Sequence, residues 1–224
     1  MRSVLLVLLS VFMPAAASQD LAALVAKVER HYDAIDDFEA DFTQRYERRF
    51  LRKTIEESGR VSVKKPGRMR WEYLQPEEKL FVTDGASSYF YIPAENQVMV
   101  SHHPEGPMGL EKGSPFELLA GTSRLTDSFS FFSSESPPSE GGVVLRAVPN
   151  THHDEFETVE LEVRPDDGTV LRVALIDSQG NRTDFTFRGI RENLDIPESQ
   201  FRFTVPSGVE VVVVQAETPQ GARP

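Results

Sequence analysis

The chain has 224 residues, no cysteine and a formal net charge of −11, from 35 acidic and 24 basic side chains. Without cysteine it has no disulfide and no thiol nucleophile. The acidic balance argues against a nucleic-acid partner, because phosphate binding needs a basic surface, and against passive adsorption to anionic lipid. The length allows one or two domains, and single β-rich domains often reach about 200–250 residues.

Residues 1–17 have the pattern of a secretory signal peptide. Arg2 supplies the positive start, Val4–Met13 is an apolar run, and Ala15–Ala17 offers an A-x-A cleavage site. The run is too short to span a bilayer, which takes about 20 residues; an uncleaved anchor is the alternative. We expect cleavage before Ser18 and, because there is no cysteine for lipidation, release into the periplasm.

The rest of the chain is predicted to be one domain, 18–214, followed by a disordered tail, 215–224. A short helix is expected over 114–121, SPFELLAG, because Ser114 can cap its start and Gly121 can end it. The domain opens with a longer amphipathic helix, whose apolar residues recur every three or four positions: Leu21, Leu24, Val25, Val28, Tyr32 and Ile35.

Outside these helices the apolar period changes to two, which indicates β-strands. Turns that contain Pro, Gly, Asn or Asp separate the strands, and strands so close in sequence are expected to pair antiparallel. The pattern favours an α+β, mainly antiparallel fold: a barrel, part-barrel or strongly curved sheet of about eleven strands, with helices covering one face. The extended segments are 38–46, 54–66, 68–74, 79–84, 88–93, 96–102, 128–132, 143–149, 158–165, 169–177, 182–190, 201–206 and 209–214.

The sequence lacks the usual catalytic motifs, with no G-x-S-x-G elbow and no Walker or Rossmann glycine pattern. The histidine pairs at 102–103 and 152–153 are poor metal ligands, because neighbours on a strand point to opposite faces. Carboxylates are plentiful, but nothing selects a catalytic pair. We therefore predict neither an enzyme nor a bound metal or cofactor.

The segment KPGRMRWEYLQP, 65–76, places Met69, Trp71 and Tyr73 on one face of a strand. The charged residues between them are expected to face solvent. Large soft and aromatic side chains fill an ordinary core, which is their commoner use, or line a pocket for an apolar ligand. The candidate lining residues are Met69, Trp71, Tyr73, Phe81, Phe90, Phe116, Leu118, Leu119 and Phe129.

Four blocks of the sequence resemble the LolA-type outer-membrane lipoprotein carriers. The longest, 65–98, has a basic residue and proline, an aromatic strand, a proline turn, a strand ending in Asp-Gly and an aromatic strand ending in proline. DFEADFTQ (37–44), SPFELLAG (114–121) and FRFTVPSGVEV (201–211) resemble the family's first strand, middle helix and closing strand. The resemblance implies an incompletely closed antiparallel half-barrel, with helices forming a lid over an apolar cavity.

The resemblance also implies a function: a periplasmic carrier, expected to be monomeric, that shields the acyl chains of lipoproteins in that cavity. Its donor would be an ATP-driven inner-membrane complex, and its acceptor an outer-membrane lipoprotein or that membrane itself. Lys65 stands where the family usually has an arginine associated with lid closure, and lysine lacks the planar fork of donors. The alternatives are a carrier or sensor of another periplasmic lipid, and a protein-binding β-domain with a packed core.

Overall fold

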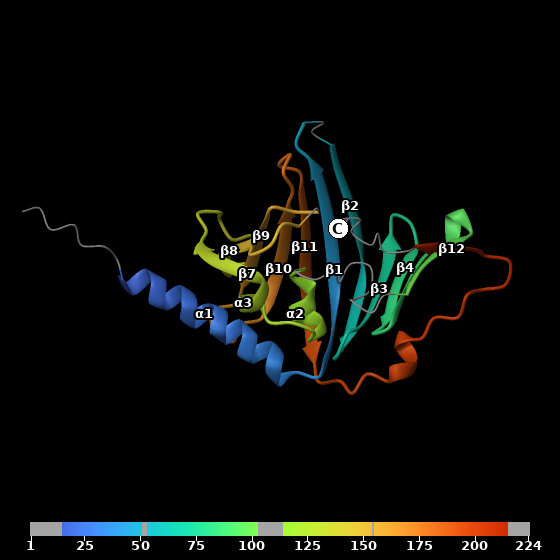
Figure 1. The fold of residues 1–224 in the computed structure, drawn as a ribbon, viewed down its shortest axis with the longest axis horizontal. Coiled ribbons are helices and arrows are strands. Elements are labelled where there is room, and N and C mark those ends of the chain that lie inside the picture. The colour runs from blue at the N-terminus through green and yellow to red at the C-terminus, as the bar shows by residue number, and fades with distance from the viewer. Residues whose placement is uncertain (1–14, 51–52, 103–113, 154, 215–224) are drawn as a thin grey trace, which may run out of the picture.

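The computed structural model describes residues 15–50, 53–102, 114–153 and 155–214, and its centre is a single open β-sheet (Figure 1). Within this part of the chain the sheet has twelve strands, in the spatial order β12-β6-β5-β4-β3-β2-β1-β11-β10-β9-β8-β7. The strands are β1 (Asp37–Arg48), β2 (Lys53–Lys64), β3 (Arg68–Gln75), β4 (Lys79–Asp84), β5 (Ser87–Ile92), β6 (Gln97–His102), β7 (Phe129–Ser133), β8 (Val143–Pro149), β9 (Thr158–Val163), β10 (Val170–Ile176), β11 (Arg182–Glu192) and β12 (Glu210–Val214).

The helices are few and short apart from the first: α1 (Ala15–Ala34), α2 (Phe116–Ala120), α3 (Leu125–Ser128) and the 3-10 turns η1 (Pro93–Glu95) and η2 (Glu198–Phe201). The long N-terminal helix and the middle helix were predicted, and α3 was not. α1 already begins at Ala15, before the predicted cleavage point. Most of the predicted signal peptide and all of the tail 215–224 lie outside the described residues. In the described part of the chain, no helix is long and apolar enough to cross a membrane.

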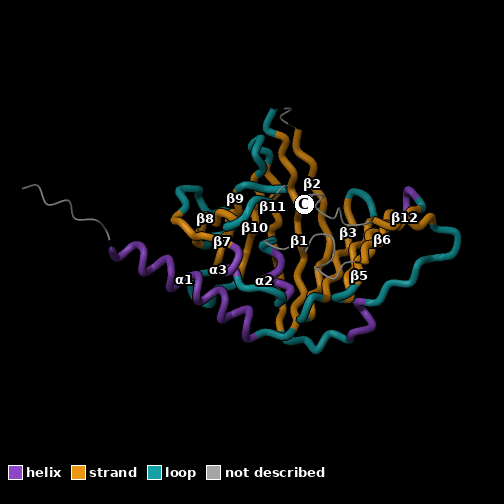
Figure 2. The backbone as a smooth tube through the Cα atoms, in the orientation of Figure 1, coloured by secondary structure: helices purple, strands orange, loops and turns teal. Residues whose placement is uncertain are grey.

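The predicted antiparallel pairing is confirmed for neighbouring strands except at one edge of the sheet. β12 runs parallel to β6, with Val211 opposite Val98. The strand predicted at 201–206 is also wrong, because Phe201 ends η2 and residues 202–206 form no strand. This segment instead crosses the convex face of the sheet (Figure 2), where Phe203 packs against Tyr89 and Tyr91 at ring distances of 5.4 and 5.7 Å.

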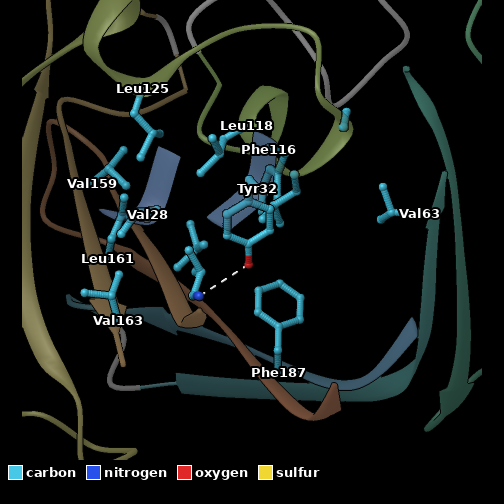
Figure 3. Packing of buried hydrophobic residues seen from close by; sticks show 14 of the residues in the cluster. Val28, Tyr32, Val63, Phe116, Leu118, Leu125, Val159, Leu161, Val163 and Phe187 are labelled. Carbon is cyan, nitrogen blue, oxygen red and sulfur yellow. Dashed lines mark hydrogen bonds between the residues drawn. The ribbon is translucent and has the colours of Figure 1, made fainter. Parts of the chain in front are cut away.

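The concave face of the sheet holds the main core. β1 shows the pattern that builds it, because Phe38, Ala40 and Phe42 are buried, whereas Glu39 and Asp41 between them are more exposed. Apolar residues from α1, α2 and α3 join the same cluster, so the three helices cover this face. In Figure 3 the strands curl around side chains from α1 and α2, with Phe187 below them and Val63 to one side. The sheet therefore forms a trough, as this helix-covered concave face is called below.

Candidate functional site

The centre of the trough is Trp71 on β3, which is only 6% exposed. Four phenylalanine rings surround the indole: the ring centroids of Phe42, Phe116, Phe185 and Phe187 lie 4.9, 5.7, 5.7 and 6.0 Å from it. The first three contacts are edge-to-face, an arrangement that aromatic pairs prefer. These five residues, the aromatic cluster, join β1, β3, β11 and α2 across the trough.

Eight of the nine predicted lining residues belong to the apolar core of the trough or pack against it. Six are buried, whereas Tyr73 and Phe81 are partly buried. The ninth, Phe90, lies opposite Phe81 in the register of β4 and β5, so it faces the same side at the periphery. The structure thus brings the predicted residues together, and their use as an acyl-chain lining stays a prediction.

Sequence reasoning missed what β1 and β11 contribute to this site. Phe42 on β1 lies opposite Phe187 on β11 in the strand pairing. The ring centroid of Phe185, also on β11, lies 5.1 Å from that of Phe116 on α2. The alternation of Phe185 and Phe187 with polar residues could have identified them as inward-facing. The pattern could not show that β1 pairs with β11, because those segments are far apart in the chain.

The aromatic lining ends at a polar rim near the far ends of β1 and β3. The Tyr73 hydroxyl donates to Oε1 of Gln44 at 2.8 Å, and Lys79 Nζ lies 5.1 Å from the Tyr73 ring centroid while pairing with Glu57. Burial, with a smaller contribution from the Glu57 charge, raises the pKa of the Tyr73 phenol. Tyr73 is therefore a neutral hydrogen-bond donor at the boundary between the apolar trough and solvent.

α1 is attached to the β9–β11 side of the trough. The Tyr32 hydroxyl accepts the backbone N–H of Val170 at 3.3 Å, the dashed line in Figure 3. Burial raises the pKa of that phenol, so it stays protonated. Nε2 of His31 lies 2.9 Å from Oε1 of Glu192, and Lys27 Nζ donates to the carbonyl oxygen of Pro165 at 2.6 Å.

α3 is attached to α1 through one buried carboxylate, Glu29, which is 3% exposed. It accepts from the backbone N–H and the hydroxyl of Thr126 at 3.0 and 2.7 Å, and from the Arg124 guanidinium at 2.7 Å. Burial raises the pKa of Glu29, but these hydrogen bonds outweigh that effect and hold its pKa below the usual value. We call this contact the Glu29 clasp; it makes α1 and α3 one unit.

α2 is attached to the opposite side, at the turn between β2 and β3. The N–H of Gly67 donates to the carbonyl oxygen of Ala120 at 2.8 Å. The predicted end of the helix is confirmed, since Gly121 is its C-cap with a φ of 67°. The predicted start is not, because Pro115 and not Ser114 is the N-cap; Ser114 Oγ only accepts the Phe116 N–H at 3.3 Å. A Cβ on Gly121 would lie 2.5 Å from Cδ of Lys65, so the lysine stem packs directly on the helix end.

Lys65, predicted to act in lid closure, therefore lies between two of the covering helices. Its N–H donates to the carbonyl oxygen of Asp36 at 2.9 Å, and its Nζ lies 5.7 Å from the Tyr32 ring centroid on α1. Burial lowers the pKa of the Lys65 ammonium, and nearby carboxylates, Asp33 first, oppose that effect. The position fits a residue that links α1 to α2, and the lid role itself stays a prediction.

The convex face under β9–β11 is charged, and part of it is buried, contrary to the expectation that this face meets water. Glu162 is fully buried; it accepts the N–H groups of Ser139, Glu140 and Gly142 and bonds the Arg172 guanidinium at 3.1 Å. The loop 134–142 supplies those N–H groups by folding over the sheet. A polar hollow of about 550 Å³ lies beside it, lined among others by Arg182 and Asp184.

The outer face of β3 is also covered, although its charged residues were expected to face solvent. Arg70 donates to the carbonyl oxygen of Gln200 at 3.2 Å, and Arg68 pairs with Glu198 at 3.4 Å. η2 therefore lies over this strand. No group of three or more His, Asp or Glu positioned to hold a metal occurs within the described ranges.

The fold and the site place the chain among proteins with an open, mainly antiparallel sheet whose apolar concave face is covered by helices. Residues 33–204 match the family model described as outer membrane lipoprotein carrier protein LolA. The chain belongs to this family.

Individual relatives agree with this assignment. The chain is 32% identical to an outer-membrane lipoprotein carrier protein of Bordetella avium, with 88% of this chain and 87% of the relative covered. It is 30% identical to the protein of the same description from Dechloromonas aromatica, covering 86% and 90%. A crystal structure of an uncharacterized conserved protein from Thermus thermophilus aligns with a TM-score of 0.53 at 18% identity, covering 88% of this chain and 99% of that chain, and supports the fold alone.

Proposed function

We propose that this chain is a periplasmic carrier that holds the acyl chains of lipoproteins in the trough and delivers them to the outer membrane. Family membership and the description of its relatives support the class of cargo. The observation that supports the trough as the site is the aromatic cluster around Trp71 beneath α2. The proposal includes removal of residues 1–17 on export, and a single domain, 18–214, that works as a monomer without catalysis.

Loading requires the helical cover to move, because Phe116 of α2 fills the space beside Trp71 and Phe185. α2 is attached to the β2–β3 turn, whereas α1 and α3 are attached to β9–β11 and to each other. We propose that the cover opens between these two units. Lys65, which contacts both Gly121 and Tyr32, would then break one of its contacts as the trough opens.

The affinity must stay moderate for cargo to leave. Burying one CH₂ contributes about 0.8 kcal/mol, so two chains of about 16 carbons would give about 25 kcal/mol in full burial. Non-covalent binding reaches a ceiling near 18–21 kcal/mol, and complexes at that limit do not release on a useful timescale. We therefore propose partial burial of the chains, opposed by the free energy needed to displace α2.

Transfer then depends on partners that favour the open or the closed cover. No nucleotide-binding motif occurs in the sequence, so the energy for loading comes from an ATP-driven inner-membrane complex. Delivery is to an outer-membrane acceptor lipoprotein or to that membrane. Such partners need to shift an equilibrium of only a few kcal/mol.

The direct test is to purify the chain from the periplasm of its native host and identify bound lipoproteins by mass spectrometry. The proposal expects triacylated or diacylated lipoproteins to co-purify in near-stoichiometric amounts. Recovery of free lipids without lipoproteins would instead support a carrier of another lipid. Recovery of neither, from a protein that is folded, would contradict the proposal.

A second test uses a fluorescent fatty acid and matched substitutions on the two faces. Phe116→Glu places a charge in the trough, and Phe203→Glu places one in the convex contact with Tyr89 and Tyr91. We expect Phe116→Glu to abolish uptake, and Phe203→Glu to retain it at a comparable loss of stability. Trp71 emission should change on binding in the parent chain. If both variants lose uptake only in proportion to stability, the trough is a packed core.

A further inference from the structure

The hairpin formed by β1 and β2 extends beyond the neighbouring β3. Pairing of β2 with β3 begins only at Ser58, opposite Gln75, so within the described ranges residues 53–57 have no ladder partner on that side. Figure 1 shows these two strands projecting from the sheet, on the side away from α1 and η2. The hairpin tip is defined here as residues 45–50 and 53–55.

The tip carries exposed apolar side chains between polar ones. Phe50 at the turn is 80% exposed, more than any other large apolar side chain reported for the described residues, and Ile55 is 40% exposed. Tyr46 lies opposite Ile55 in the ladder, on the same face as Phe42 of the aromatic cluster. Beyond the polar rim at Gln44 and Glu57, the tip therefore presents a separate group of apolar side chains that includes an exposed aromatic ring. The β10–β11 hairpin flanks it on one side, where the Arg49 N–H donates to Oδ1 of Asn181 at 3.2 Å.

The tip is also basic in an acidic protein. Its residues include four basic and one acidic side chain, a formal charge of +3, which leaves −14 for the rest of the net −11. Arg48 is directly opposite Lys53, a like-charge pair that destabilises an isolated ribbon. Within the described ranges neither of them, nor Arg49, forms an ion pair with a carboxylate, although other arginines of the sheet do.

We propose that the hairpin tip docks the protein on a lipid surface with anionic headgroups. Lipid phosphates would neutralise the unpaired cations, and the Phe50 ring would enter the interfacial region, where aromatic side chains are favoured. A lipid surface, unlike a protein partner, needs no matching shape. The combination of cations with an exposed aromatic ring thus favours lipid over an acidic protein.

This docking goes beyond carriage, because it needs no cargo and can be tested without lipoprotein. It also refines the conclusion drawn from net charge. The whole chain is repelled by an anionic surface, but the screening length is about 10 Å at moderate salt, so a projecting tip responds mainly to its own charge. Docking by the tip would orient the ribbon end of the trough toward the bilayer.

The test is flotation of the protein with vesicles. The full sequence is expressed, the product made by the cell is purified, and its mass defines where it has been processed. Vesicles of phosphatidylcholine alone are compared with vesicles containing about one third phosphatidylglycerol, at low and at moderate salt. We expect binding only to the anionic vesicles, weakening as salt rises.

Two variants test the contribution of the tip. Replacing Arg48, Arg49 and Lys53 by glutamine should lower the partition constant about a hundredfold, at about fivefold per cation. The matched control replaces three exposed arginines elsewhere by glutamine and changes net charge equally: Arg30, Arg146 and Arg202.

The aromatic part of the contact has its own pair of variants. Phe50→Ser should lower binding about tenfold, because an exposed ring is no longer buried in lipid. The control is Phe132→Ser on β7, a ring that is 44% exposed. The proposal is overturned if the parent chain does not bind anionic vesicles at low salt, or if each control loses as much binding as its matched tip variant.

Discussion

The two faces of the sheet enclose their central side chains in different ways. On the concave face Trp71 is surrounded by four phenylalanine rings, and on the convex face Glu162 is surrounded by three backbone N–H groups and the Arg172 guanidinium. Apolar contacts are non-directional and an acyl chain can replace them. A buried charge network is satisfied in one arrangement only. The comparison therefore predicts two roles. Side chains on the concave face can rearrange to admit an apolar ligand, whereas the charge network on the convex face holds the curvature of the sheet in place.

The largest effect is expected from Glu162→Gln on the convex face. The substitution removes the charge that Arg172 and the loop 134–142 surround, and breaking a buried pair costs about 3–5 kcal/mol. We expect that loss in the free energy of unfolding, measured by urea denaturation, with unchanged fatty-acid affinity in the molecules that remain folded. Glu210→Gln, at an exposed site, is the control and should change stability by less than about 0.5 kcal/mol.

Acid should weaken the same face. Burial raises the pKa of Glu162, but the N–H groups of Ser139, Gly142 and Glu140, followed by Arg172, lower it to about 2, from a usual 4.5. A folded pKa below the unfolded one gives stability that is complete above pH 4.5 and lost as the pH falls toward 2. Urea midpoints should fall across this window. The decline should be shallower in Glu162→Gln; an identical decline would show that other carboxylates cause it.

On the concave face, Phe185→Ala should separate stability from function. It removes a half-buried ring that contacts Trp71 and Phe116. We expect the free energy of unfolding to fall by about 2–3 kcal/mol, because neighbouring side chains do not refill the cavity that the ring leaves. An apolar void binds apolar ligands, so the fluorescent fatty acid should bind more tightly than to the parent chain. Weaker binding by a folded variant would contradict the view that the ring competes with the ligand.

A smaller effect is expected at the Glu29 clasp. Glu29→Gln weakens the charge-assisted bond to Arg124 and should cost about 1–2 kcal/mol. Because α3 then separates more easily from α1, uptake of the fatty acid should become faster in stopped-flow measurements. The companion substitution Arg124→Gln removes the same Arg124–Glu29 bond by changing its exposed partner. It should also speed uptake of the fatty acid, with a smaller loss in the free energy of unfolding.

The smallest effect is expected for Lys65→Ala, which removes the stem that packs on Gly121. We expect a loss of up to about 1 kcal/mol and a modest rise in the rate of probe uptake. Lys65→Arg retains the stem and adds donors, so it should preserve the parent rate or slow it. Equal rates in all three proteins would remove Lys65 from the lid mechanism.

Much of the concave face was predictable from sequence, because period and turn chemistry are local. Met69 and Trp71 alternate with charged residues, and Gly121 directly follows the short apolar helix that it ends. Pattern alone could not assign faces on β5, where Ser-Tyr-Phe-Tyr-Ile has aromatic residues on both sides. The pairing of β4 with β5 places Phe90 on the trough side, because it lies opposite Phe81. Tyr89 and Tyr91 lie on the opposite face, where they contact Phe203.

The convex face was not predictable, because long-range cover decides its burial. Glu160 and Glu162 alternate with apolar residues as solvent-facing charges do, yet the loop 134–142 folds over them. The same reason explains the strand wrongly predicted at 201–206. The alternating apolar residues of segment 201–206 are buried or partly buried because the segment packs onto β3–β5, where Phe201 is only 1% exposed. The segment does not pair there with any strand of the described sheet.

The two outermost strands of the sheet bear on how much the width of the trough can change. β7 and β12 lie at opposite ends of the strand order, so the described sheet does not close on itself. The circumference of a closed barrel is fixed by its strand number and shear, and it widens only if hydrogen bonds break. An open sheet can widen or narrow through small changes of twist spread over all its ladders. If the trough holds cargo as proposed, cargoes that differ in the number and length of their acyl chains would be accommodated by elastic bending of one scaffold, with no change of sequence.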